Sequence, residues 1–251
     1  MNSFFSSTAN CHVRWQDLQG SGTPIIFVHG LGCASSYEYP QVVTEPSFGV
    51  RKAILIDLPG CGDSDKPLNY SYSITEQAKV VVELVQHLGL KQCFLYGHSM
   101  GGSISIEAAE LLGKRLLGLV VSEPNFHPGG GLFSKEICRY GEDKFVETIW
   151  HQMVKEEEGS LWAGSLAVDA PWAVWRGAAN LIAGNNWLER FVQLPISKQL
   201  IFGEYSLPDD DFSSLTSSGV STIILPGCGH SMSWENPRAL AEALSHFCDS
   251  I

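Results

Sequence analysis

The chain has 251 residues, and 16 Lys and Arg against 27 Asp and Glu give it a formal net charge of −11. Hydrophobic residues make up 44% of the chain and charged residues 17%, the reverse of a disordered composition, so the chain folds. The length suits one α/β domain with a large core. The acidic balance repels nucleic-acid phosphates and anionic lipid headgroups, so we expect neither nucleic acid nor a membrane as a partner.

Apolar runs and cysteines indicate the compartment. No apolar run reaches the ~18–20 residues of a membrane span. Residues 1–10 lack the basic and apolar regions of a secretory signal. The seven cysteines are odd in number and scattered, and none forms a C-x-x-C pair. We therefore expect reduced thiols that fill small apolar spaces in a cytoplasmic protein.

Short apolar runs alternate with amphipathic helical patterns along the chain. The first strand signal, at residues 13–15, indicates an antiparallel entry ribbon. Runs bounded by turn residues then predict buried strands at 24–28, 53–56, 93–96, 116–121, 199–202 and 222–225. Helices are predicted at 74–88, capped by Ser73 or Thr75, at 100–112, and from 237 onward. This alternation predicts an α/β fold with a doubly wound, mostly parallel sheet.

The alternation breaks once, between residues 124 and 198. Helical patterns at 145–154 and 171–183 replace strands there, and five of the seven tryptophans lie in this stretch, at positions 150, 162, 172, 175 and 187. Such an insert must bury its aromatic surface against something. We therefore expect a helical cap over the end of the sheet, formed by residues 124–198, on a core domain formed by residues 1–123 and 199–251.

A serine lies at a predicted strand-to-helix turn. Gly97-His98-Ser99-Met100-Gly101 fits the pattern G-x-S-x-G, which in another context would mark an ordinary turn. A sharp turn of this kind lifts the serine hydroxyl clear of the backbone, and only glycines leave room on either side. The helix that follows directs N–H groups and a positive dipole toward any oxyanion. The context therefore predicts Ser99 as a nucleophile.

Two other glycine-rich loops follow predicted strands. In His29-Gly30-Leu31-Gly32, the N–H of Leu31 can form an oxyanion hole with the N–H of Met100, whereas His29 is expected to bond the loop rather than act as a base. Gly227-Cys228-Gly229-His230 follows the last strand. A neutral imidazole suits removal of a hydroxyl proton near neutral pH, so His230 is the predicted base.

No other pattern indicates a cofactor. No His, Cys or Asp cluster has metal-ligand spacing, and no glycine-rich loop matches a phosphate or dinucleotide fingerprint. We expect no metal and no organic cofactor. Among the remaining histidines, His127 lies just inside the insert and is at best a substrate contact. The others outside the motifs are expected at the surface or half-buried, namely His12, His87, His151 and His246.

With these motifs, the chain resembles the α/β-hydrolases over nearly its full length. The resemblance also rests on residues 57–64, Asp57-Leu58-Pro59-Gly60-Cys61-Gly62-Asp63-Ser64, a loop that shapes the fold and the mouth of the site in that family. It implies a charge relay of Ser99 and His230, oxyanion donors on Leu31 and Met100, and a cap inserted after the sixth strand. Because the nucleophile position holds a serine, the chain departs from the dehalogenase and epoxide hydrolase branches, which use aspartate.

The acid of such a relay is missing from its usual place. The family's acid follows the seventh strand, but Gly203-Glu204-Tyr205-Ser206 has a serine at that position. Some branches place a glutamate after the preceding strand, and Glu123 matches that position. The apolar run before Glu123 and the insert after it indicate burial, and a buried carboxylate needs a partner such as His230.

Other acids stay open as alternatives. Asp209, Asp210 and Asp211 follow the usual position closely, although Pro208 indicates a helix start that these carboxylates would cap. Glu204, or no acid at all, is the remaining alternative.

The expected function is that of a carboxylesterase-like serine hydrolase, which cleaves small, fairly apolar carboxylic esters through an acyl-enzyme. The same site could cleave a lactone, a thioester or a C–C bond. A non-catalytic ligand receptor is the second hypothesis, kept open by the missing acid. Trp162, Trp172, Trp175 and Trp187 are the expected substrate contacts, with at least two of them expected to anchor the cap instead. The partner is a small-molecule substrate, and the sequence does not indicate an oligomeric state.

Overall fold

A computed structural model describes all residues from 1 to 251. Eight strands form one sheet in the order β1-β2-β4-β3-β5-β6-β7-β8. The strands are β1 Asn2–Ser6, β2 Cys11–Leu18, β3 Ser21–Val28, β4 Arg51–Asp57, β5 Cys93–His98, β6 Leu116–Ser122, β7 Ser197–Gly203 and β8 Ser221–Leu225. The β1–β2 and β2–β4 pairs are antiparallel and all later pairs are parallel, which confirms the predicted mostly parallel sheet with its entry ribbon.

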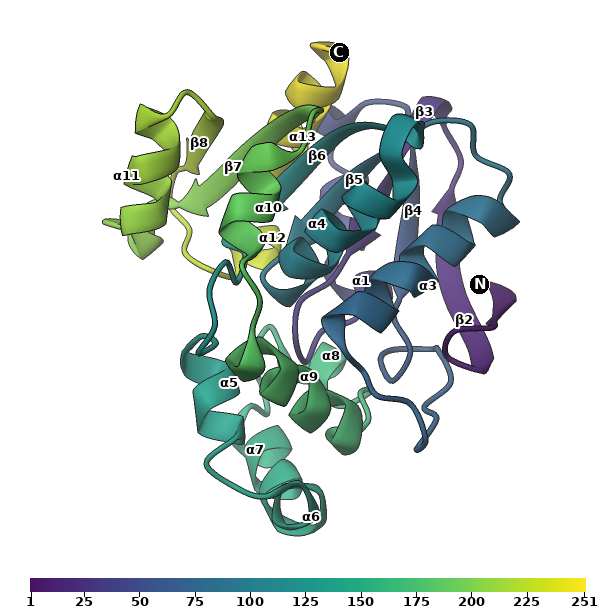
Figure 1. The fold of residues 1–251 in the computed structure, drawn as a ribbon, viewed down its shortest axis with the longest axis vertical. Coiled ribbons are helices and arrows are strands. Elements are labelled where there is room, and N and C mark those ends of the chain that lie inside the picture. Colours follow the sequence, from purple (N-terminus) through teal and green to yellow (C-terminus); the bar gives the residue numbers. More distant parts are fainter.

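Helices cover both faces of the sheet (Figure 1). The α-helices are α1 Ser35–Glu38, α2 Pro40–Val43, α3 Ile74–His87, α4 Met100–Leu112, α5 Leu132–Ile137, α6 Glu142–Lys144, α7 Trp150–Glu156, α8 Ala163–Leu166, α9 Pro171–Ala183, α10 Trp187–Gln193, α11 Asp210–Ser217, α12 Met232–Glu235 and α13 Pro237–Asp249. The apolar side chains of α3 and α4 belong to one large core cluster, and those of α2 and α13 to a second. No helix combines the length and the apolarity that crossing a membrane requires.

The predicted central strands are buried, whereas the last one is not. The interior residues of β3, β4, β5 and β6 are almost wholly enclosed because each strand has a neighbour on both sides and helices on both faces. β8 ends the sheet, and Ile224 is 48% exposed. The prediction of a buried strand at residues 222–225 is therefore wrong in burial, because an edge strand pairs on one side only. Of the two predicted caps for α3, Ser73 is the one used, since its side chain accepts a hydrogen bond from the Glu76 N–H.

The insert between β6 and β7 is helical, as expected. α5, α6, α7, α8 and α9 gather at one end of the sheet, at the bottom of Figure 1. The predicted helix at 145–154 begins as a π-helical turn, Phe145–Ile149, and continues as α7. The last helix of the insert, α10, lies apart from this group and packs against α4 of the core. We propose that residues 124–198, α10 included, form one cap.

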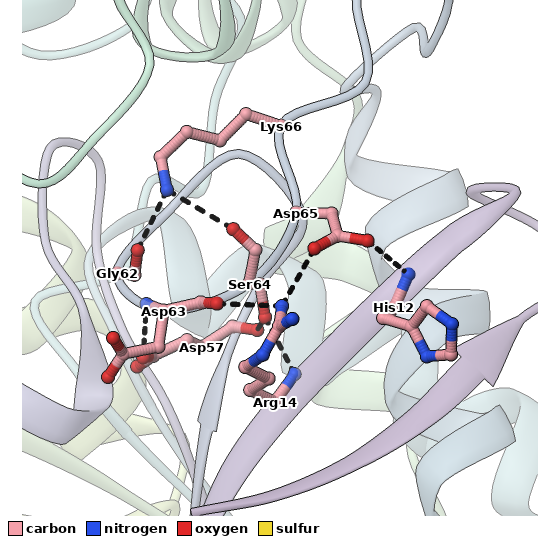
Figure 2. Close-up of polar contacts among 8 residues, drawn as sticks. All are labelled: His12, Arg14, Asp57, Gly62, Asp63, Ser64, Asp65 and Lys66. Atoms are coloured by element: carbon pink, nitrogen blue, oxygen red, sulfur yellow. Dashed lines mark hydrogen bonds and ion pairs between the residues drawn. The ribbon is translucent and has the colours of Figure 1, made fainter.

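The loop after β4, residues 57–64, is fixed by polar contacts with its own backbone and with β2 (Figure 2). Asp57 is wholly buried and accepts the Asp63 N–H at 3.0 Å. The Ser64 hydroxyl donates to the Asp57 carbonyl at 2.6 Å and accepts the Arg14 N–H at 2.8 Å. Beyond the loop, Arg14 pairs with Asp65 at 2.8 Å. These contacts hold the loop rigidly at the carboxyl end of β4.

Candidate active site

Ser99 lies at a strained turn between β5 and α4. Its φ of 51° and ψ of −120° fall in a region that side chains other than glycine rarely adopt. Its N–H donates to the Ser122 carbonyl of β6 at 2.9 Å, which ties the turn to the neighbouring strand. Backbone strain of this kind costs about 1–3 kcal/mol and concentrates at functional sites. The local geometry is that expected of a nucleophile elbow.

The glycines on either side of Ser99 are required by close packing. A Cβ on Gly97 would lie 2.3 Å from the Gly101 carbonyl oxygen, and a Cβ on Gly101 would lie 2.2 Å from the Val28 carbonyl oxygen. Neither contact is sterically possible. The tight turn at Ser99 therefore depends on both glycines of the motif.

The loop after β8 brings His230 to Glu123, the residue that follows β6. His230 Nδ1 lies 2.7 Å from Glu123 Oε2. Because a carboxylate only accepts, Nδ1 carries the hydrogen and Nε2 is left as the basic nitrogen. The Glu123 side chain is 8% exposed and the His230 side chain 55%. No hydrogen bond joins His230 to the Ser99 hydroxyl in this structure.

The surroundings of Glu123 favour its ionised form. Burial on its own would raise the pKa of Glu123, but the hydrogen bond and charge of His230 outweigh it and bring the pKa below its usual value. The Gly203 N–H, which donates to Glu123 Oε1 at 3.0 Å, and the Ser206 hydroxyl act in the same direction. Ser206, the serine at the usual acid position, thus supports the glutamate carboxylate.

None of the alternative acids forms a hydrogen bond with His230, and three of them, Asp209, Asp211 and Glu204, have partners elsewhere, whereas the Asp210 side chain has no hydrogen-bond partner. Asp209 caps α11 by accepting the Phe212 N–H at 2.8 Å. Asp211 pairs with His127 at 2.9 Å. Glu204 accepts the Gly227 N–H at 2.8 Å. Among the predicted acids, only Glu123 has a hydrogen bond to His230.

The loop predicted to carry an oxyanion donor passes beside Ser99. A Cβ built on Gly30 would lie 3.3 Å from Ser99 Cβ. The buried His29 ring accepts the Leu58 N–H on Nε2 at 3.0 Å, so its Nδ1 donates to the Gly30 carbonyl at 2.9 Å. That carbonyl belongs to the same peptide unit as the Leu31 N–H. His29 therefore orients the predicted donor peptide, in keeping with its expected structural role.

Met100, the other predicted oxyanion donor, is the first residue of α4 and directly follows Ser99. Its side chain lies close to Leu31, since a Cβ on Gly177 of α9 would lie 2.9 Å from Leu31 Cδ1 and 3.3 Å from Met100 Sδ. The structure therefore brings together Ser99, Leu31 and Met100. Their roles in catalysis stay predictions.

Sequence reasoning missed His98. Its ring centroid lies 4.6 Å from that of His230, and its Nδ1 lies 2.9 Å from the Ser122 hydroxyl. Tyr96 in turn places its hydroxyl 2.8 Å from the same oxygen. Burial first, and then the neighbouring His230, lower the pKa of His98 to about 3, so the ring is neutral near neutral pH. Its place beside Ser99 in the motif was the only sequence signal for it.

The four tryptophans predicted as substrate contacts occupy different surroundings. Trp187 is 2% exposed and donates to Glu107 of α4 at 2.8 Å, as an anchoring residue does. Trp172 donates to the Tyr72 hydroxyl at 3.3 Å and Trp175 to the Tyr140 carbonyl at 2.9 Å. Trp162 reaches the loop beside Ser99 and donates to the Gly32 carbonyl at 2.6 Å. Contact with a substrate stays a prediction for all four.

A family model described as the alpha/beta hydrolase fold matches residues 23–135, a segment that includes Ser99 and Glu123. The eight-stranded sheet with its flanking helices is that fold. The chain therefore has the α/β-hydrolase fold, and slightly less than half of its length matches the model of that family.

Individual relatives and structures are similar over different parts of the chain. The dihydrolipoyllysine-residue acetyltransferase component of an acetoin cleaving system from Pseudomonas putida is 36% identical over 111 residues, 43% of this chain and 28% of that protein. Haloalkane dehalogenase 2 from Mycobacterium tuberculosis is 32% identical over 121 residues, 48% of this chain and 42% of that protein. The matched segments thus span less than half of either relative.

A thermophilic esterase from Thermogutta terrifontis shares the fold over almost the whole chain. The TM-score is 0.82, and the match covers 99% of this chain and 98% of that chain at 19% identity. At this identity the likeness shows a shared fold and nothing more.

Proposed function

We propose that this protein is a carboxylesterase-like serine hydrolase that cleaves small, fairly apolar carboxylic esters through an acyl-enzyme intermediate. The observation that carries the proposal is the strained Ser99 turn together with the His230–Glu123 pair at 2.7 Å. A buried carboxylate on one imidazole nitrogen leaves the other as a base, as nucleophilic catalysis by a serine needs.

In this mechanism the Ser99 hydroxyl attacks the ester carbonyl while His230 Nε2 accepts its proton. Glu123 holds the imidazole tautomer and stabilises the imidazolium that forms. The N–H groups of Leu31 and Met100 stabilise the oxyanion. His230 then protonates the leaving alcohol, and a water molecule, deprotonated by the same imidazole, releases the acid and regenerates Ser99. The catalytic hydrogen bond between Ser99 and His230 forms in the substrate complex, since such bonds are often long or unmade in a free enzyme.

The alternatives share this site. A lactone, a thioester or a C–C bond next to a carbonyl presents the same electrophile to Ser99. A non-catalytic receptor is less favoured. The reason to consider a receptor was that no acid occupies the usual position after β7, but Glu123, directly after β6, supplies a carboxylate to His230. The proposal includes a cytoplasmic setting, which rests on the odd, scattered cysteines.

A series of p-nitrophenyl esters from acetate to octanoate tests the proposal. An initial burst followed by turnover is expected, with the largest kcat/KM for the shorter acyl chains. Ser99→Ala should lower kcat by roughly 10⁴–10⁶-fold and leave the fold intact, because the serine acts as a unit with its base. If Ser99→Ala keeps more than about a tenth of the activity, Ser99 is not the nucleophile. Tight binding without turnover would identify a receptor. Turnover of lactones or thioesters but not of simple esters would mean that the substrate belongs to one of those classes.

A further inference from the structure

The cap grips the loop that carries Leu31 through two hydrogen bonds. The indole N–H of Trp162, the residue that precedes α8, donates to the Gly32 carbonyl at 2.6 Å. One turn later, the hydroxyl of Ser165 accepts the Ala34 N–H, also at 2.6 Å. Ser165 is 1% exposed and Ala34 is wholly buried, so water does not compete for this bond. Trp162 and Ser165, three residues apart in the cap, thus bond to Gly32 and Ala34, which are two residues apart in the loop.

Close packing accompanies these bonds. Gly32 has a φ of +70°, and a Cβ there would lie 2.6 Å from the Trp162 ring and 3.1 Å from Leu166 Cδ1. The Trp162 ring also meets Phe133 of α5 edge-on, with ring centroids 4.5 Å apart. The indole therefore has a fixed place between the loop and another cap helix.

Three side chains bond to the peptide units of the loop between residues 30 and 34. His29, from the core, holds the unit that contains the Leu31 N–H through the Gly30 carbonyl. Trp162 holds the unit between residues 32 and 33, and Ser165 holds the next unit. Of the four units from residue 30 to residue 34, three have a side chain bonded to them. Two of those three side chains belong to the cap.

We propose that Trp162 and Ser165 form a clamp by which the cap positions the loop of residues 30–34. The way the cap sits on the core then controls the transition-state stabilisation that the Leu31 N–H provides. This inference rests on the proposed function. Oxyanion donors work because they are held in place before the reaction, and loss of one donor costs about 10²–10³ in kcat. A clamp that only steadies the donor should carry a smaller effect, of the size of one or two hydrogen bonds.

The test separates positioning from substrate contact. Trp162→Phe removes the N–H and keeps an aromatic ring, and Ser165→Ala removes the acceptor. Each should lower kcat for p-nitrophenyl acetate by roughly 5–20-fold, the equivalent of about one hydrogen bond, with KM within about twofold. An alkyl trifluoromethyl ketone, which binds serine hydrolases as an oxyanion, should lose affinity by the same factor.

Two matched variants control for general damage to the cap. Trp150→Phe makes the same change in a buried cap tryptophan that packs on Phe145, and Ser134→Ala makes it in a buried cap serine bonded to the Gly131 carbonyl. Both should leave kcat and ketone affinity within about twofold. If Trp162→Phe or Ser165→Ala changes KM alone, or lowers the melting temperature with kcat unchanged, the clamp is overturned.

Amide hydrogen exchange decides the matter without catalysis. The clamp predicts faster exchange across residues 30–34 in Trp162→Phe, including at Ala34, whose own bond partner Ser165 is untouched. Trp150→Phe should exchange there like the wild type. Unchanged exchange in Trp162→Phe overturns the clamp. An inactive wild type with the expected exchange overturns the esterase proposal and leaves the clamp supported as a structural element.

Discussion

Ser99 and Glu123 are two of the four residues other than glycine that have positive φ, at 51° and 39°. Each lies at the carboxyl end of a central strand, where the chain must turn sharply to aim a side chain into the crevice. Steric strain at both ends of the proposed relay is consistent with a built site, because such conformations persist only where the surroundings impose them.

Among single-residue changes, Glu123→Gln is the most informative substitution. The amide keeps the shape but removes the charge that stabilises an imidazolium, so kcat should fall ~10²–10⁴-fold with KM little changed. Steady-state kinetics on one ester measures both constants.

Asp209→Asn and Asp211→Asn are the controls for that experiment. Asp209 caps α11 and Asp211 pairs with His127, so each change should cost less than about fivefold in kcat, the scale of a cap or a surface pair felt at a distance. If an Asp variant is the more damaged, the acid lies after β7 and Glu123 has another role.

Residues with local sequence signals were the predictable part of the site. Ser99 and His230 lie in glycine-flanked loops after strands, and the strand order alone brings such loops to one edge of a sheet. The contact of Glu123 with His230 could be expected from the gap at Ser206. The close contact of the His98 ring with the His230 ring and the bond of Trp162 to Gly32 could not be predicted, because both depend on side-chain directions set by tertiary packing.

At the level of elements, α10 is joined to α4 by a buried polar contact. Trp187 and Arg190 both donate to Glu107, whose other oxygen accepts the Thr75 hydroxyl of α3. The composition of residues 124–198 predicted one insert. It could not show that α10, within this insert, packs against α4 of the core, because an amphipathic helix does not reveal which neighbour it packs against.

Trp187→Ala should destabilise the protein by about 3–5 kcal/mol, since it leaves a cavity and strips one donor from a buried carboxylate. The free energy of unfolding in urea measures this, and the acyl-chain preference should stay as in the wild type. Leu132→Ala, at a cap residue 91% exposed, should change stability by less than about 0.5 kcal/mol. A changed chain-length preference without loss of stability would mean that Trp187 faces substrate.

For the molecule as a whole, buried acids make stability depend on pH. Glu38 of α1 is 1% exposed and accepts the Ser233 hydroxyl of α12 at 2.8 Å. Burial raises the pKa of Glu38 to about 7. Burial likewise raises the pKa of Asp169, in the segment before α9, well above its usual value. Both acids are therefore protonated in the folded protein at pH values where the unfolded chain has lost those protons.

The sign of the effect follows from these protons. The folded state binds more protons than the unfolded state between the ordinary Glu pKa of 4.5 and about 7, so stability falls as the pH rises through that range. Urea unfolding at pH 5 and pH 8 should show a decrease that is smaller in Glu38→Gln, by on the order of 3 kcal/mol, because Gln cannot ionise. An equal decrease in the variant would mean that Glu38 is already ionised at pH 5 in the folded protein.

Acylation of Ser99 with the help of His230 is tested most directly by trapping the acyl-enzyme intermediate. The protein is quenched in acid within the burst with p-nitrophenyl acetate, digested, and mapped by mass spectrometry. We predict acetylation of the peptide at Ser99, absent in Ser99→Ala and strongly slowed in His230→Gln. Turnover with no adduct on Ser99, or acetylation of Ser99 at the same rate in His230→Gln, would contradict the account.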